Sequence, residues 1–166
     1  MSNFFEALAN LISWLSKIFK PKEEPKPQVK QIIAVPWDTV VAELKGLGLV
    51  LINKDGFQPD YYIQYVDEED WQKLAPFLTF SGEYYVLGIE PLPDCDDYAK
   101  KASVEAAFKF HVSCLETWGD TPYGRHAFSL VKVGEKAYRI FEPNAGFEEA
   151  GELFKFGEYR PDCWRL

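Results

Sequence analysis

The chain has 166 residues, 47% of them hydrophobic, which suits one globular domain with a substantial core. Its net charge of −8 argues against nucleic-acid binding, because phosphate contacts need a basic surface. No apolar run approaches the roughly 20 residues that span a bilayer, and the N-terminus lacks the pattern of a secretory signal. Cys95, Cys114 and Cys163 are widely spaced, as is typical of free thiols in a reducing compartment, although a disulfide between two of them stays open. A cytoplasmic location is the resulting prediction.

Residues 3–19 carry the clearest helical pattern in the chain. Apolar side chains recur at steps of four and three residues, at positions 4, 8, 11, 15 and 18. Three uses of this amphipathic helix stay open: it folds back on its own domain, it docks into a protein partner or a symmetric copy, or it lies on a membrane surface. Membrane contact is the weakest of the three, because the polar face has few basic residues and includes Glu6.

Residues 20–30 are rich in proline and charge, which predicts an extended, solvated linker between the helix at 1–19 and a domain at 31–166. In that domain the pattern predicts a strand at 32–36, a helix at 37–48, short strands at 49–52 and 61–66 around a turn at 54–56, and a helix from 67 to 76.

A long central helix is then predicted from Cys95 to Gly119, with Cys95 in its first turn and Cys114 near its end. Two strands follow at 126–133 and 137–142, joined by a turn at 134–135. Together these elements predict an α+β fold, in which the central helix packs on an antiparallel sheet.

Residues 94–98, DCDDY, place a thiol among three acids at the start of the central helix. The positive end of the helix dipole favours the thiolate of Cys95, whereas the acidic neighbours disfavour it. A cysteine nucleophile also needs an imidazole within about 3–4 Å. His111 lies farther along the same predicted helix, roughly 24 Å away at 1.5 Å per residue, so His126 is the remaining candidate.

The predicted hairpin brings an acid to this histidine. With a turn centred near residue 134, His126 pairs across from Glu142 or Pro143. The order Cys95, His126, Glu142 then fits a nucleophile, a general base and an orienting acid. A small core cysteine, a satisfied strand histidine and a strand-end acid would give the same pattern, so the residues alone leave both interpretations open.

Three motifs taken together, DCDDYA, GRHAFSLV and FEPN, resemble the papain-like and transglutaminase-like cysteine peptidase superfamily. They are most similar to the C-terminal protease domain of fungal chimeric agglutinins, whose relatives include small phage-encoded proteins. The resemblance covers residues 90–166 well and 31–89 loosely. It implies a papain-like fold for residues 31–166, and a peptidase site in which Cys95 is the nucleophile, His126 the general base and Glu142 the orienting acid.

The resemblance also implies a divalent cation, calcium or manganese, held beside the site by Asp96, Asp97, Glu142 and Asn144. Such an ion would offset the acids around Cys95 and favour its thiolate. The plainer interpretation is that Asp96 and Asp97 complement the helix dipole. The chain departs from the pattern in two ways: it lacks the agglutinin's sugar-binding β-trefoil, and no glutamine shortly precedes Cys95 to help bind an oxyanion.

Two functions from different classes therefore stay open. One is a cysteine peptidase, amide hydrolase or acyl transferase that acts on a peptide or protein substrate. The other is a catalytically silent structural or interaction protein of a phage particle, tethered through residues 3–19 and found in the virion or the host cytoplasm. A calcium-binding module without chemistry is a third interpretation.

Overall fold

The computed structural model describes residues 9, 11–12, 27–52, 61–81 and 94–166. These ranges contain both helices and strands, and the last five strands follow one another with no helix between them, which confirms the predicted α+β class. The helical elements are α2 (Trp37–Gly46), α3 (Glu68–Leu74), the 3₁₀ turn η1 (Ala75–Leu78), α4 (Cys95–Glu105) and the π-helical turn η2 (Ala106–Phe110). The strands are β1 (Ile33–Pro36), β2 (Val50–Leu51), β3 (Tyr62–Tyr65), β4 (Cys114–Thr121), β5 (Gly124–Gly134), β6 (Ala137–Phe141), β7 (Leu153–Phe154) and β8 (Arg160–Arg165).

A six-stranded sheet with the order β2-β8-β4-β5-β6-β7 forms the centre of the molecule, and β1 pairs with β3 in a separate two-stranded sheet. The central sheet is mixed, because β2 runs parallel to β8 while the other neighbours are antiparallel. The purely antiparallel sheet that the sequence predicted is therefore wrong. Parallel pairing needs a long connection between the two strands, and more than a hundred residues separate β2 from β8, so no local turn signal could announce it.

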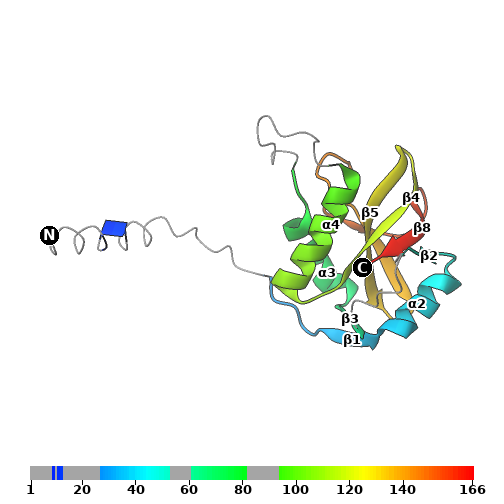
Figure 1. The fold of residues 1–166 in the computed structure, drawn as a ribbon, viewed down its shortest axis with the longest axis horizontal. Helices are drawn as coiled ribbons and strands as arrows, with labels where there is room; N and C mark the ends of the chain where they lie inside the picture. Colours follow the sequence, from blue (N-terminus) through cyan, green and yellow to red (C-terminus); the bar gives the residue numbers. More distant parts are fainter. Residues whose placement is uncertain (1–8, 10, 13–26, 53–60, 82–93) are drawn as a thin grey trace.

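Side chains along each strand alternate between two faces of this sheet, and each face has its own core. On β5, Phe128 and Leu130 belong to the cluster that contains α2, whereas Val131 and Val133 belong to the cluster that contains α3 and α4. Figure 1 shows α4 lying across the sheet in front of β4 and β5. The fold is therefore a sheet covered by helices on both faces.

The central helix is much shorter than the predicted helix from Cys95 to Gly119. After η2, His111 adopts a left-handed backbone conformation with φ of 58° and ends the helical run. Cys114 and Gly119 consequently lie on β4. Gly119 serves close packing of strands, because a Cβ at this position would lie 2.0 Å from the Arg160 carbonyl oxygen on β8.

The other predicted elements of the domain are found close to their predicted places, as β1, α2, β2, β3 and α3. Asp67 caps α3 by accepting a hydrogen bond from Asp70 N at 2.8 Å. The predicted turn at 54–56 lies outside the described residues. None of the described helices is long and apolar enough to cross a bilayer.

The predicted N-terminal helix lies mostly outside the described residues; of its length, residues 9, 11 and 12 are described, and they are helical. The linker is described from residue 27 onward. Its last residues are in part packed and in part solvated: Val29 packs against the core and Lys30 N donates a hydrogen bond to Asp70 Oδ2 at 2.5 Å, whereas Gln28 and Lys30 are exposed. The packed body of the protein therefore begins slightly before residue 31.

Candidate active site

The hairpin of β5 and β6 brings His126 and Glu142 into direct contact. Its register pairs Leu130 with Ile140, and a bulge near Gly134 moves the turn to residues 135–136, so the pairing differs from the predicted one by a residue or two. His126 Nε2 nevertheless lies 2.8 Å from Glu142 Oε2, and both side chains are buried. The side chains of His126 and Glu142 are long enough to touch although the strand pairing differs slightly from the predicted one, so the predicted contact is found.

Three donors surround the Glu142 carboxylate. Asn144 N donates to Oε1 at 2.9 Å, His126 lies against Oε2, and the Tyr159 hydroxyl lies 3.5 Å from Oε2. Burial raises the pKa of Tyr159, and the carboxylates of Glu142 and Glu149 raise it further, so this hydroxyl stays a donor. Both carboxylate oxygens of Glu142 are therefore engaged by neighbouring groups.

This carboxylate fixes the orientation of the His126 ring. Because Glu142 accepts, the hydrogen-bond network places the imidazole proton on Nε2 and leaves Nδ1 with a lone pair. Among the described residues, Nδ1 makes no hydrogen bond. The ring is packed against Phe147, with centroids 4.5 Å apart, and Tyr159 lies edge-on at 6.4 Å. Glu142 holds the imidazole of His126 through Nε2. The lone pair on Nδ1 is therefore placed to accept a proton.

Cys95 is the first residue of α4 and is partly exposed. The helix begins there because Asp94 and Asp97 form a reciprocal capping box, in which Asp94 N donates to Asp97 Oδ2 at 3.3 Å. In the first turn of a helix, the backbone N–H groups have no intrahelical partner. The thiol thus lies in the first turn of the helix, as the sequence predicted, next to the backbone N–H groups of Asp96 and Asp97 that donate to the Asp94 carboxyl.

In the part of the chain that the structure describes, the thiol of Cys95 and the imidazole of His126 are not hydrogen-bonded to each other. His126 packs with Phe128 and Tyr159 in the core on the α2 face, while α4 packs on the opposite face of the sheet. Because the sheet separates the two faces, the Cys95 thiol and the His126 ring could approach each other only around the edge of the sheet, near the first turn of α4.

One chain of contacts does join α4 to the segment after Glu142. The Lys101 ammonium lies 4.1 Å from the centre of the Phe80 ring, and Phe80 N donates to the Pro143 carbonyl at 2.8 Å. Phe80 also forms an isolated bridge with Asn144. The second half of α4 and the residues that follow Glu142 are consequently neighbours through Phe80.

The acids around Cys95 interact with one another. A hydrogen bond between the carboxyl groups of Asp94 and Asp96 raises the pKa of Asp96 and lowers the pKa of Asp94. These two carboxyl groups are therefore coupled to each other at the start of α4.

The predicted metal ligands are engaged with the protein itself. Asp97 takes part in the helix cap, both Glu142 oxygens accept hydrogen bonds, and Asn144 Oδ1 accepts from Gly146 N at 2.9 Å. Within the described ranges, no group of three or more His, Cys, Asp or Glu side chains converges to hold a metal ion. These side chains therefore do not converge as a set of oxygen ligands in the described residues.

The other two cysteines are unsuited to nucleophilic chemistry. All three thiols are free, as predicted. Cys114 is fully buried, and burial raises its pKa to about 12. Burial and then the neighbouring Asp162 raise the pKa of Cys163. The side-chain amide of Gln64 is of a type that could donate to an oxyanion, but Gln64 accepts from Ser113 Oγ at 3.2 Å near the far end of α4, away from Cys95.

Tyr159 and Phe147, which hold Glu142 and cover His126, were missed by the sequence interpretation. Both lie in the stretch between β6 and β8, where the sequence shows no clear period. Their role depends on a loop returning over the hairpin, which spacing does not encode. The only feature of the sequence that could have drawn attention to them is that each is an aromatic residue in a segment rich in glycine and acidic residues.

No known protein family and no curated protein matches the sequence. The structure is similar to a solved structure named PSL1a-E64 complex, with a TM-score of 0.53 and 16% sequence identity. The match covers 79% of this chain and 50% of the other, so this chain spans about half of that protein's length. At this identity the likeness concerns the fold alone.

Proposed function

We propose that the chain is a cysteine peptidase-like hydrolase or acyl transferase with a papain-like fold, in which Cys95, His126 and Glu142 act on a peptide or protein substrate. The observation that carries this proposal is the buried His126–Glu142 pair, which leaves Nδ1 as a base. Free thiols are typical of a reducing compartment, so the cytoplasm, or the host cytoplasm or virion of a phage, is the proposed location.

The reaction follows from these groups. His126 Nδ1 takes the proton of the Cys95 thiol, and the thiolate attacks the carbonyl carbon of the substrate. The tetrahedral intermediate collapses to a thioester as the imidazolium gives its proton to the leaving amine. Water, or a second amine in acyl transfer, then attacks the thioester, His126 accepts its proton, and the thiol is restored.

Glu142 acts through the ring rather than on the substrate. As an acceptor it holds the tautomer with the proton on Nε2, and its negative charge stabilises the imidazolium. The N–H of Cys95, unpaired in the first helical turn, is positioned to donate to the oxyanion. The step requires Cys95 Sγ to come within about 3–4 Å of Nδ1, which sets the geometry that the experiment tests.

The experiment is alkylation by iodoacetamide at neutral pH, followed by peptide mass spectrometry of each cysteine. We expect Cys95 to react at least tenfold faster than Cys114 or Cys163, because one of these is buried and both have raised pKa values. Glu142→Gln should slow Cys95 alone, because the amide no longer requires the Nε2 proton. Equal rates for Cys95 in the parent and in Glu142→Gln would contradict the proposed site.

The fold likeness supports a second probe. The name of the similar structure includes E64, and we propose that E64 adds to Cys95 of this chain. The measurement is the intact mass after incubation, with Cys95→Ser as the matched control. Absence of an adduct on the parent chain, where iodoacetamide labels Cys95 quickly, would exclude binding of this compound.

The dependence on calcium or manganese implied by the resemblance is a separate proposal. Its measurement is the melting temperature with and without excess calcium, in the parent chain and in Asp97→Asn. Stabilisation that is lost in Asp97→Asn would support a metal site beside α4. An unchanged melting temperature would mean that these acids serve only the helix cap.

One observation favours a second function, a catalytically silent structural or interaction protein of a phage particle. In the described chain the thiol of Cys95 and the ring of His126 are not hydrogen-bonded, and α4 packs on the face opposite His126. In that case His126 and Glu142 form a buried structural pair. Slow alkylation of all three cysteines would support this function over the enzymatic one.

A further inference from the structure

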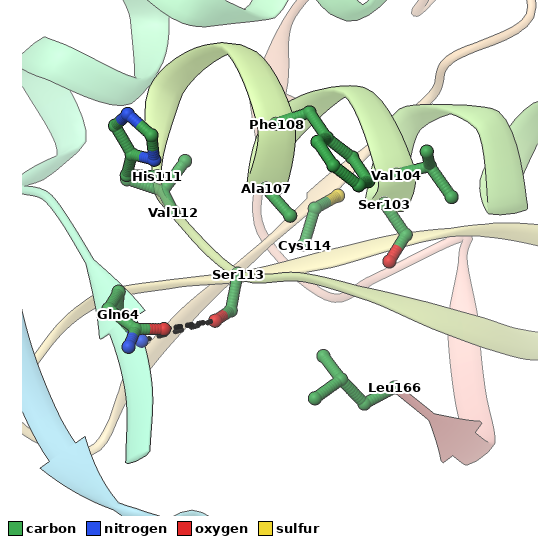
Figure 2. A pocket seen from close by; sticks show the side chains of 10 residues that line it. All are labelled: Gln64, Ser103, Val104, Ala107, Phe108, His111, Val112, Ser113, Cys114 and Leu166. Atoms are coloured by element: carbon green, nitrogen blue, oxygen red, sulfur yellow. Dashed lines mark hydrogen bonds between the residues drawn. The ribbon is translucent and has the colours of Figure 1, made fainter. Parts of the chain in front are cut away.

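An apolar groove lies at the C-terminal end of α4, away from the candidate active site. It has a volume of about 420 Å³ and is lined by both apolar and hydroxyl-bearing side chains. Figure 2 shows Val104 and Phe108 along the helical run, with Leu166 across from them and Gln64 hydrogen-bonded to Ser113 at the side. We refer to this feature as the α4 groove.

The wall of the α4 groove is unusually exposed for apolar residues. Val104 and Phe108 lie one turn apart and are 48% and 81% exposed. The π-helical turn and the left-handed His111 end the helix here and open the space between η2 and the start of β4. An exposed aromatic beside a preformed hollow is typical of a docking surface.

The sequence of the same chain predicts a second apolar surface in its N-terminal segment. Residues 3–19 have an amphipathic pattern, and Leu11 and Ile12, described within it, are 50% and 58% exposed. A single amphipathic helix of this length is marginal in water, because most helix stability comes from packing its apolar face. A groove that binds such a helix contacts the apolar side chains that recur every three or four residues along it.

The tether places these two surfaces within reach of each other. The packed body begins near Val29, which packs with the cluster that includes Phe110, two residues after Phe108. Ala34, a few residues further on, pairs with Gln64, which lines the groove. The seven residues 20–26 span at most about 25 Å, comparable to the size of a small domain.

We propose that residues 3–19 dock as a helix into the α4 groove of the same chain. Its apolar side chains at 4, 8, 11 and 15 would cover Val104 and Phe108, and the prolines at 21, 25 and 27 would keep the connection extended. This docking is independent of the proposed chemistry, because the groove lies at the opposite end of α4 from Cys95.

The experiment uses the full chain with the photoreactive amino acid p-benzoylphenylalanine at position 108. The matched control carries it at position 61, where Tyr61 is 82% exposed and lies outside the groove. Both sites are on the surface, so both variants should fold. After irradiation, peptide mass spectrometry identifies the cross-linked segments, and mixing of isotopically heavy and light chains separates contacts within a chain from contacts between chains.

We expect position 108 to cross-link to residues 3–19 within one chain, at least tenfold more than position 61. Leu11→Asp or Leu15→Asp in the same chain should reduce this yield about tenfold while leaving the melting temperature of the body unchanged. Equal yields from 108 and 61, absence of cross-links to 3–19, or cross-links only between heavy and light chains would each overturn the proposal.

Discussion

Two cysteine–histidine combinations can be compared along α4, one with its cysteine at the start of the helix and one beyond its end, and they differ in burial and in partners. At the start, Cys95 is partly exposed in the first turn, and His126 on the neighbouring hairpin is held by a buried carboxylate. Beyond the other end, Cys114 is fully buried on β4, and His111 is an exposed residue that ends the helical run. Residue type alone does not separate the two pairs.

The difference comes from the electrostatic surroundings. A helix start presents unpaired N–H groups and favours a thiolate, while a helix end presents carbonyl groups and disfavours it. Burial adds to this by raising the pKa of Cys114 to about 12. Among the described residues, an acid partner is hydrogen-bonded to His126 and none to His111. The end of the molecule with the apolar groove is therefore suited to docking, and the other end to proton transfer.

The largest effect that would separate the two ends is expected from the histidines. His126→Ala should lower the rate constant of Cys95 alkylation by about 100-fold, because general-base catalysis typically contributes at least that factor. His111→Ala is the matched control and should leave the rate unchanged. The measurement is the time course of Cys95 modification by peptide mass spectrometry. A loss of reactivity in both variants, or in neither, would remove the distinction between the ends.

The next effect concerns the strand that supports His126. Gly119 lies opposite His126 on β4, and an added Cβ would meet the Arg160 carbonyl oxygen at 2.0 Å. Gly119→Ala should therefore lower the free energy of unfolding by about 2–3 kcal/mol, because neither backbone can move aside cheaply. Gly46→Ala, at the end of α2 with open space around it, is the control and should be neutral or slightly stabilising. Urea unfolding measures both.

A smaller effect is expected at the carboxylate. Tyr159→Phe removes one hydroxyl whose contacts to Glu142 and Glu149 are long, 3.5 and 3.4 Å. A hydrogen bond of this kind contributes about 1 kcal/mol or less, so Cys95 alkylation should slow by a factor of about five at most. His126 and Glu142 remain in place, and a loss as large as that of His126→Ala would show that Tyr159 does more than hold the acid.

The smallest effect is an expected absence of reaction. The folded-state pKa of Cys114 is about 12, so its thiolate stays scarce from pH 7 to pH 9 and rises only as the pH approaches that value. Alkylation of Cys114 in the folded chain should therefore remain negligible across this range, and should become rapid in urea. Fast labelling of Cys114 in the folded chain at pH 8 would mean that solvent and reagent reach Cys114 through the α4 groove.

A buried ion pair gives an independent comparison across the sheet. Burial alone would raise the pKa of Glu43, but hydrogen bonds from Lys132 and Tyr138 outweigh it, and the pKa is lowered. A lowered carboxyl pKa contributes stability that is present above the unfolded value of about 4.3 and is lost as the pH falls through the folded value. Glu43→Gln should therefore destabilise the chain at pH 7 and flatten the acid limb of its stability curve, measured by melting temperature against pH.

The sequence by itself determined much of the local structure and the pairing of the two hairpin residues. Short-range signals, such as Asp67 at a helix start and the two strands around residue 135, depend only on neighbouring residues and were confirmed. His126 and Glu142 meet because a tight hairpin fixes which residues can face each other, within the reach of their side chains.

Only the tertiary structure decided where the central helix ends, which strands run parallel, and on which face of the sheet each group lies. Gly119, read as a helix terminator, proved to be the point where β8 approaches β4, because contact between distant strands leaves no periodic trace in the sequence. The same holds for the placement of Cys95 relative to His126. Spacing along the chain limits which residues can meet, but the sheet decides which of them share a face.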